Sequence, residues 1–276
     1  MIAHEPGTWR VLYFDVPFRG EQVRMLFAVA GQPFVDTRLN FPKGLIPYKK
    51  AALGDESPLL GTDKCPAVTA PDGTHCIETA DIMRFVGQQV GLAPLAGSTE
   101  DATAVAVTLL AQQAINKIFY PLFRKMIMKR LLGHCVGSLV VGREASYITQ
   151  PAAFLSKFCR SIEDTLGASG GPYVCGAKLS YADISIFASL DEVLAFDCFD
   201  RAAVLGSHPK LATLMADLEG RTQAWVDHRV REHQLGIRSS VQFLVNTNTP
   251  VPWARRAFPP SRKAEESRWS PEATSS

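Results

Sequence analysis

Strand-like patterns are confined to the first 90 residues of this 276-residue chain, and every apolar pattern after residue 100 has helical spacing. Short runs of β-branched and aromatic residues at 10–14 and 33–39 enclose a helical pattern at 21–30, which stops at Gly31. A mixed part followed by a purely helical part is typical of two layered domains. The sequence therefore predicts an α/β fold joined to an all-α fold.

A hairpin and a helix complete the mixed part. Two short strands at 66–69 and 74–77 are joined by Pro-Asp-Gly, in which proline presets φ and glycine accepts a positive φ. The predicted domains are an α/β domain over residues 9–92, a linker over 93–99, a helical domain over 100–235 and a tail over 236–276.

The tail differs in composition from the rest. From Pro250 to the end the chain has five basic and three acidic residues, which leaves 24 of each in the body. A neutral body gives no broad electrostatic reason to bind nucleic acid or an anionic membrane. The prolines and the few aliphatics predict a largely disordered tail. Trp253 and Trp269 could anchor it on the body or on a partner.

The termini and cysteines narrow the class further. The amino terminus has no secretory signal pattern, and apolar runs such as residues 25–30 are far shorter than the roughly 20 residues of a membrane span. We therefore expect a cytoplasmic protein without a membrane partner. Six cysteines form no C-x-x-C pair, so we expect free thiols and no metal site.

One local signal marks the start of a buried helix. Ser180 and Asp183 have the spacing of a capping box, with Leu179 and Ile184 at the positions of a hydrophobic staple. This motif has a structural role and no direct chemical one.

Three motifs in order resemble the cytosolic glutathione transferase family, over roughly residues 9–232. They are Leu12-Tyr13-Phe14 followed by Arg19-Gly20-Glu21 and Arg24, then Lys64-Cys65-Pro66 followed by Glu78-Thr79-Ala80-Asp81, and then the capping box after Gly176. The resemblance implies a thioredoxin-like amino-terminal domain and a helical carboxy-terminal domain. The first motif is most similar to the sigma class, which includes haematopoietic prostaglandin D synthase.

The resemblance also implies a catalytic residue. Family members use Tyr, Ser or Cys near the end of the first strand, and this chain has no Ser before Ser57 and no Cys before Cys65. The implied catalytic residues are Tyr13, whose hydroxyl would donate to the glutathione sulfur, and Arg19, which would add positive charge. The alternative is that Tyr13 is a half-buried aromatic residue of a strand and Arg19 is a charged residue of a loop.

Further positions match the family's glutathione contacts. Glu78 and Thr79 at a helix start would hold the γ-glutamyl carboxylate. Pro66 would form a cis peptide bond, so that the Cys65 backbone pairs with the cysteinyl unit. The Cys65 thiol could form a mixed disulfide with the ligand or be a small buried side chain. Lys50 and Lys64 are the candidates for the glycine carboxylate, with solvated surface lysines as the alternative.

The second substrate would occupy an apolar pocket between the domains, for which Phe14 is the candidate lining residue. The implied activity is attack of the glutathione thiolate on a hydrophobic electrophile, as in detoxification, with isomerisation and peroxide reduction left open. Glutathione would be a co-substrate with no permanent cofactor, and the family implies a homodimer.

Two departures and the extra tail favour a second hypothesis, a non-catalytic interaction module with the same fold. The family's tryptophan near residue 46 is absent, and a sigma-class acidic position falls at Val107.

Overall fold

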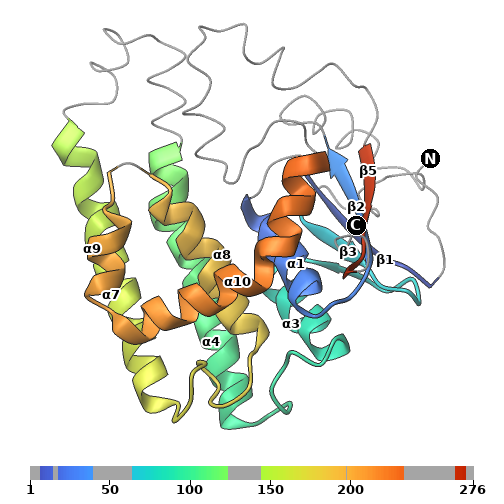
Figure 1. Cartoon of the computed structure of the whole chain (residues 1–276), viewed down its shortest axis with the longest axis horizontal. Helices are drawn as coiled ribbons and strands as arrows, with labels where there is room; N and C mark the ends of the chain where they lie inside the picture. The colour runs from blue at the N-terminus through green and yellow to red at the C-terminus, as the bar shows by residue number, and fades with distance from the viewer. Residues whose placement is uncertain are drawn as a thin grey trace, which may run out of the picture. The chain divides into compact units, whose positions relative to one another are not determined.

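The computed structural model describes residues 7–14, 18–39, 64–123, 144–196, 198–232 and 265–271. These residues divide into two compact units (Figure 1). The first contains the described residues up to Leu92, together with the end of the last helix and a strand near the carboxy terminus, and the second contains residues 93–220.

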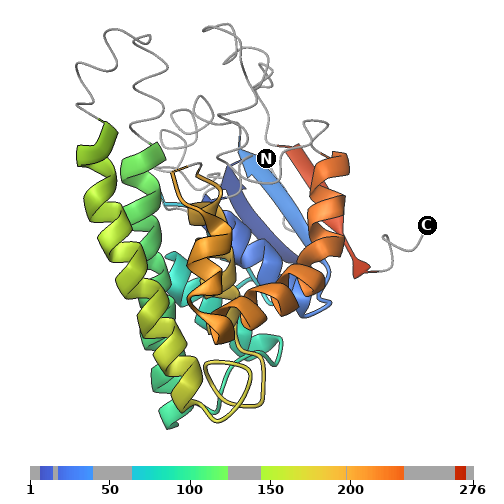
Figure 2. The same cartoon turned by 60° about the vertical axis from the view of Figure 1, so that its left-hand side comes forward.

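A mixed sheet is the centre of the first unit. Its elements are β1 (Trp9–Phe14), α1 (Phe18–Val29), β2 (Phe34–Leu39), β3 (Ala67–Thr69), β4 (His75–Ile77), α3 (Thr79–Gln89) and β5 (Glu265–Trp269). The strand order is β4-β3-β1-β2-β5, in which only the β1–β2 pair is parallel. Because parallel neighbours need a crossover, α1 connects β1 to β2, and α1 and α3 lie together against the sheet (Figures 1 and 2).

The local signals in this unit form the elements that they predict. α1 ends at Val29, just before the helix stop expected at Gly31, whose φ is +65°, and the Gln32 amide donates to the Phe27 carbonyl at 2.9 Å. In the hairpin, Gly73 has a φ of +89° and the Ala70 amide donates to the Thr74 carbonyl at 2.8 Å. Both turns use glycine where the chain needs a positive φ.

The second unit is helical in its described residues, as predicted. Its elements are α4 (Thr99–Ala114), a π-helical turn η1 (Ile115–Phe119), α7 (Glu144–Ala168), α8 (Tyr181–Leu194), α9 (Arg201–Gly206) and the first part of α10 (Pro209–Glu232). The π-helical turn lies just before Pro121, which has no amide hydrogen to donate to the helix. The apolar pattern of the sequence predicts two separate helices over 209–218 and 222–232, and this prediction is wrong, because α10 is continuous through residues 218–222.

The capping box at the start of α8 is present. The Asp183 carboxylate accepts hydrogen bonds from the Ser180 amide at 2.8 Å and from the Ser180 hydroxyl at 2.7 Å. Its other oxygen accepts from the Val174 amide at 2.9 Å. One fully buried carboxylate therefore joins the helix start to the loop before it.

The tail contributes a strand, where the sequence predicted a largely disordered segment. β5 pairs with β2 in antiparallel register, from Phe34 opposite Trp269 to Arg38 opposite Glu265. Trp269 is 3% exposed. The sequence left open whether this residue anchors the tail on the body of the chain or on a partner, and in the structure it packs on the body. Trp253 and most of the tail lie outside the described residues.

Candidate functional site

The strand register brings three of the predicted site residues to one end of the sheet. Leu12 of β1 is opposite Ala67 of β3, and Ala67 is opposite Ile77 of β4. Because these pairs are antiparallel, the next residues past this row are Tyr13, Pro66 and Glu78. Three segments that are separate in the sequence therefore meet at the same edge.

Tyr13 lies tightly against the first turns of α1. Its side chain is 4% exposed, and a Cβ atom added to Gly20 would stand 2.3 Å from the Tyr13 Cδ1 atom. Only glycine therefore allows the helix to approach the ring so closely. Arg19 precedes this glycine and is partly buried, and Phe18 begins the helix with a φ of +43°. The motif thus places Tyr13, the predicted catalytic residue of β1, against α1, the helix that follows this strand.

The peptide bond between Cys65 and Pro66 is cis, as the resemblance implies. Cys65 is partly exposed, whereas Pro66 is buried. The Lys64 ammonium forms an ion pair with the Glu78 carboxylate at 2.6 Å, and both side chains are about half exposed. This pair joins the segment before β3 to the segment after β4.

The start of α3 has two features typical of a ligand site. Glu78, the residue before the helix, has φ 65° and ψ 120°, a backbone conformation that residues other than glycine rarely adopt. Thr79 is 2% exposed, and within the part of the chain that the structure describes its hydroxyl has no hydrogen-bond partner. A buried hydroxyl beside the amides of a helix start is suited to hold an anion.

The remaining predicted residues are placed as follows. Phe14 is 8% exposed and packs edge-on against Tyr13, with ring centroids 5.3 Å apart. Val107, at the position of the family's acidic residue, is 5% exposed in α4. Lys50 and the segment around residue 46 lie outside the described residues.

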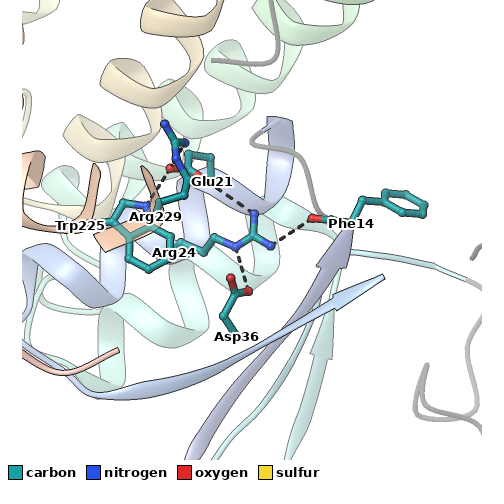
Figure 3. Close-up of polar contacts among 6 residues, drawn as sticks. All are labelled: Phe14, Glu21, Arg24, Asp36, Trp225 and Arg229. Carbon is teal, nitrogen blue, oxygen red and sulfur yellow. Dashed lines mark hydrogen bonds and ion pairs between the residues drawn. The ribbon is translucent and has the colours of Figure 1, made fainter. Parts of the chain in front are cut away.

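Sequence reasoning missed a buried cluster of charges, which contains Glu21, Arg24, Asp36 and Arg229 (Figure 3). The Arg24 guanidinium donates to the Asp36 carboxylate at 2.9 Å and to the Phe14 carbonyl at 3.1 Å. It also lies 5.8 Å from the centroid of the Tyr13 ring and 3.7 Å from the Glu21 carboxylate. Arg24 therefore fixes the end of β1, where Tyr13 lies.

The end of α10 completes this cluster. The Glu21 carboxylate accepts a hydrogen bond from the Trp225 indole at 2.7 Å and a short one from Arg229 (Figure 3). Glu21 and Arg24 belong to the motif that the sequence analysis singled out, but their partners lie up to 208 residues away. No local pattern connects residues at that separation.

Two described cysteines of the second unit, Cys159 and Cys175, are poor nucleophiles. Burial raises the pKa of the Cys159 thiol to about 12 and that of Cys175 to about 11. At neutral pH both are protonated, and a thiol reacts as its thiolate.

Comparisons with known proteins agree with the fold. Residues 150–225 match the family model of the glutathione S-transferase C-terminal domain. The chain is 27% identical over 204 residues to "Glutathione S-transferase P 10" of Caenorhabditis elegans, with 73% of this chain and 81% of the relative covered. It is 26% identical over 183 residues to "Glutathione S-transferase 1" of Ascaris suum, with 66% and 78% covered.

Solved structures show the same architecture. The glutathione S-transferase of Ascaris lumbricoides superposes with a TM-score of 0.62 at 23% identity, covering 80% of this chain and 97% of that one. A Nu-class enzyme of Haemonchus contortus gives 0.61 at 19% identity, with 80% and 97% covered. Prostaglandin synthase D of Nilaparvata lugens gives 0.52 at 20% identity, with 80% and 98% covered.

The chain consists of a thioredoxin-like unit followed by a helical unit. This is the glutathione S-transferase fold, and the matching family model and curated relatives carry glutathione S-transferase names. Nu-class and Pi-class structures are among the neighbours, so the sigma class is not singled out.

No helix in the described ranges is long and apolar enough to cross a membrane. Those ranges also contain no group of three or more His, Cys, Asp or Glu side chains arranged for a metal ion.

Proposed function

We propose that this protein is a glutathione S-transferase in which Tyr13 stabilises the glutathione thiolate, in the manner of the sigma class. The observation that carries the proposal is the buried Thr79 hydroxyl without a described partner, beside the strained Glu78 and at the same sheet edge as Tyr13. An unpaired buried hydroxyl costs free energy, so a ligand that accepts its hydrogen bond would explain its position.

The γ-glutamyl carboxylate would bind at the start of α3, where the Thr79 hydroxyl and the helix amides are donors. The Cys65 backbone, exposed before Pro66, would pair with the cysteinyl unit. Lys64, held near this edge by Glu78, would lie toward the glycine carboxylate, together with Lys50. The ligand would then place its sulfur near Tyr13.

At that sulfur, the Tyr13 hydroxyl would donate a hydrogen bond that favours the thiolate over the thiol. Arg19 would add a positive charge to the same effect. Each unit by which the thiol pKa falls corresponds to about 1.4 kcal/mol of differential stabilisation. The thiolate then attacks an electrophilic carbon of a hydrophobic substrate, a carbon–sulfur bond forms, and the leaving group departs with its electron pair.

Further features of this proposal rest on the family resemblance or on the sequence alone. We propose a homodimer, a cytoplasmic location and a role in detoxification, with Phe14 facing the second substrate. Glutathione would be a co-substrate, with no permanently bound cofactor.

The second candidate function is a non-catalytic module with this fold. It is favoured by the buried Val107 at the family's acidic position, since that side chain offers no carboxylate. Turnover of a chlorodinitrobenzene-type substrate by the purified full chain separates the two functions, because the module has none.

Thr79→Val tests the glutathione site directly. Valine has the shape of threonine without the hydroxyl, so we expect about tenfold weaker glutathione binding by calorimetry and an unchanged or slightly higher Tm. Thr108→Val is the matched control, because Thr108 in α4 is 1% exposed and its hydroxyl also has no described partner. Equal glutathione affinity in both variants would contradict the proposed site.

A further inference from the structure

The tail strand β5 covers the outer edge of β2. All five of its residues are in register with residues 34–38 of that strand (Figure 2). An open edge of this length exposes a row of amides and carbonyls that can pair with other chains. β5 occupies those groups from within the same chain, so the sheet has five strands.

Trp269 anchors this strand by its ring. It lies opposite Phe34, with centroids 5.8 Å apart, and 6.4 Å from the centroid of Trp225. Phe34 and Trp225 are themselves 5.5 Å apart, so the three rings form one buried cluster. An aromatic pair across neighbouring strands adds to the stability of their pairing. Arg268, the preceding residue, is exposed.

The ring cluster continues into the buried cluster of charges. Trp225 packs against Trp269 and donates its indole hydrogen bond to Glu21. Glu21 follows Gly20, which lies against the Tyr13 ring. A continuous series of contacts therefore leads from Trp269 through Trp225 and Glu21 to the first turns of α1.

We propose that Trp269 is a positioning residue, which holds the first turns of α1 against Tyr13 through Trp225 and Glu21. Its consequence for catalysis rests on the proposed function of Tyr13, but its effect on α1 does not. Loss of the Trp269 ring would free Trp225 to move and weaken its hydrogen bond to Glu21. The helix start would then become more mobile, and the orientation of the Tyr13 hydroxyl would be less well defined.

The experiment compares hydrogen–deuterium exchange of the full-length wild type with that of Trp269→Ala. We expect amides of residues 18–24 to exchange roughly tenfold faster in the variant, while amides of α8 in the second unit keep their rates. Arg268→Ala changes the same strand at an exposed position and should match the wild type. Trp269→Phe retains a ring and should restore most of the protection, and Trp269→Leu replaces the alanine variant if that one does not fold.

Trp225→Phe tests the middle link, because it keeps a ring and removes the indole donor to Glu21. It should also speed exchange at residues 18–24. A uniform acceleration throughout both units in Trp269→Ala would show a purely structural strand and overturn the proposal, as would unchanged exchange in α1.

A kinetic readout separates this proposal from the proposed function. If the wild type conjugates glutathione, Trp269→Ala should lower kcat and raise the apparent pKa of kcat/KM, whereas Arg268→Ala should change neither. A loss of Tm with an unchanged pH profile would contradict the positioning role. If the wild type has no activity, the proposed function fails, and the exchange measurement still decides whether Trp269 holds α1.

Discussion

At the scale of single residues, the contact between Gly20 and Tyr13 defines the candidate site most sharply. A Cβ atom at residue 20 would stand 2.3 to 2.8 Å from three atoms of the tyrosine side chain, so the helix and the ring cannot both keep their places. The sequence pattern identified both residues but not their contact, because side-chain direction at a strand end depends on the packed helix. The observed position of the Tyr13 ring therefore requires glycine at residue 20.

Gly20→Ala should lower the free energy of unfolding by about 1–3 kcal/mol, because overpacking strains a tight contact. It should also reduce conjugation activity, since the Tyr13 ring must move. Gly220→Ala is the control: no atom stands within 4 Å of its added Cβ, and alanine in a helix interior is about 0.5–1 kcal/mol more favourable than glycine. Urea denaturation measures both, and equal stabilities would contradict the close contact.

At the scale of elements, Asp183 stabilises the start of α8 through three hydrogen bonds in a fully buried position. Asp183→Ala leaves the amides of Val174 and Ser180 without this partner. We expect a loss of about 2–4 kcal/mol, measured by denaturant unfolding, because each buried unsatisfied group costs about 1–3 kcal/mol. A loss below 0.5 kcal/mol would contradict this role of the carboxylate.

The loss of stability caused by Asp183→Ala should depend on pH. Burial raises the pKa of the Asp183 carboxyl above its ordinary value of 3.8, despite its hydrogen bonds. A group whose folded-state pKa is raised stabilises the fold fully below its ordinary pKa, and that stability declines as the pH rises through the raised value. The difference in stability between wild type and Asp183→Ala should therefore narrow as the pH rises above about 4. A difference in stability between the two proteins that widens over this range would contradict the raised pKa of Asp183.

Elements with strong local signals could be predicted from the sequence, and those that depend on distant partners could not. The hairpin, α1 and the capping box each carry their own turn or cap residues. β5 is a five-residue strand with three charged side chains in a proline-containing tail, and its strand conformation depends on the open edge of β2. The continuous α10 has the same explanation, because its end packs on the sheet unit while its own residues include Gly220.

At the scale of the whole molecule, the order of elements together with the resemblance of the motifs was enough to predict the fold. The charge cluster could not be predicted, because Glu21 meets residues of α10 more than 200 positions later. Lys50 and the family's tryptophan position lie outside the described residues, so their part in the site stays a prediction.

The most direct test of the central claim is the pKa of the glutathione thiol when it is bound to the full-length protein. Thiolate absorbance is followed against pH for the wild type and for Tyr13→Phe, which keeps the ring against Gly20. We predict that the wild type lowers the thiol pKa clearly below the ordinary value of about 8.5, and that the variant returns it most of the way. Equal thiol pKa values in the two proteins, with glutathione bound to both, would contradict the role of Tyr13.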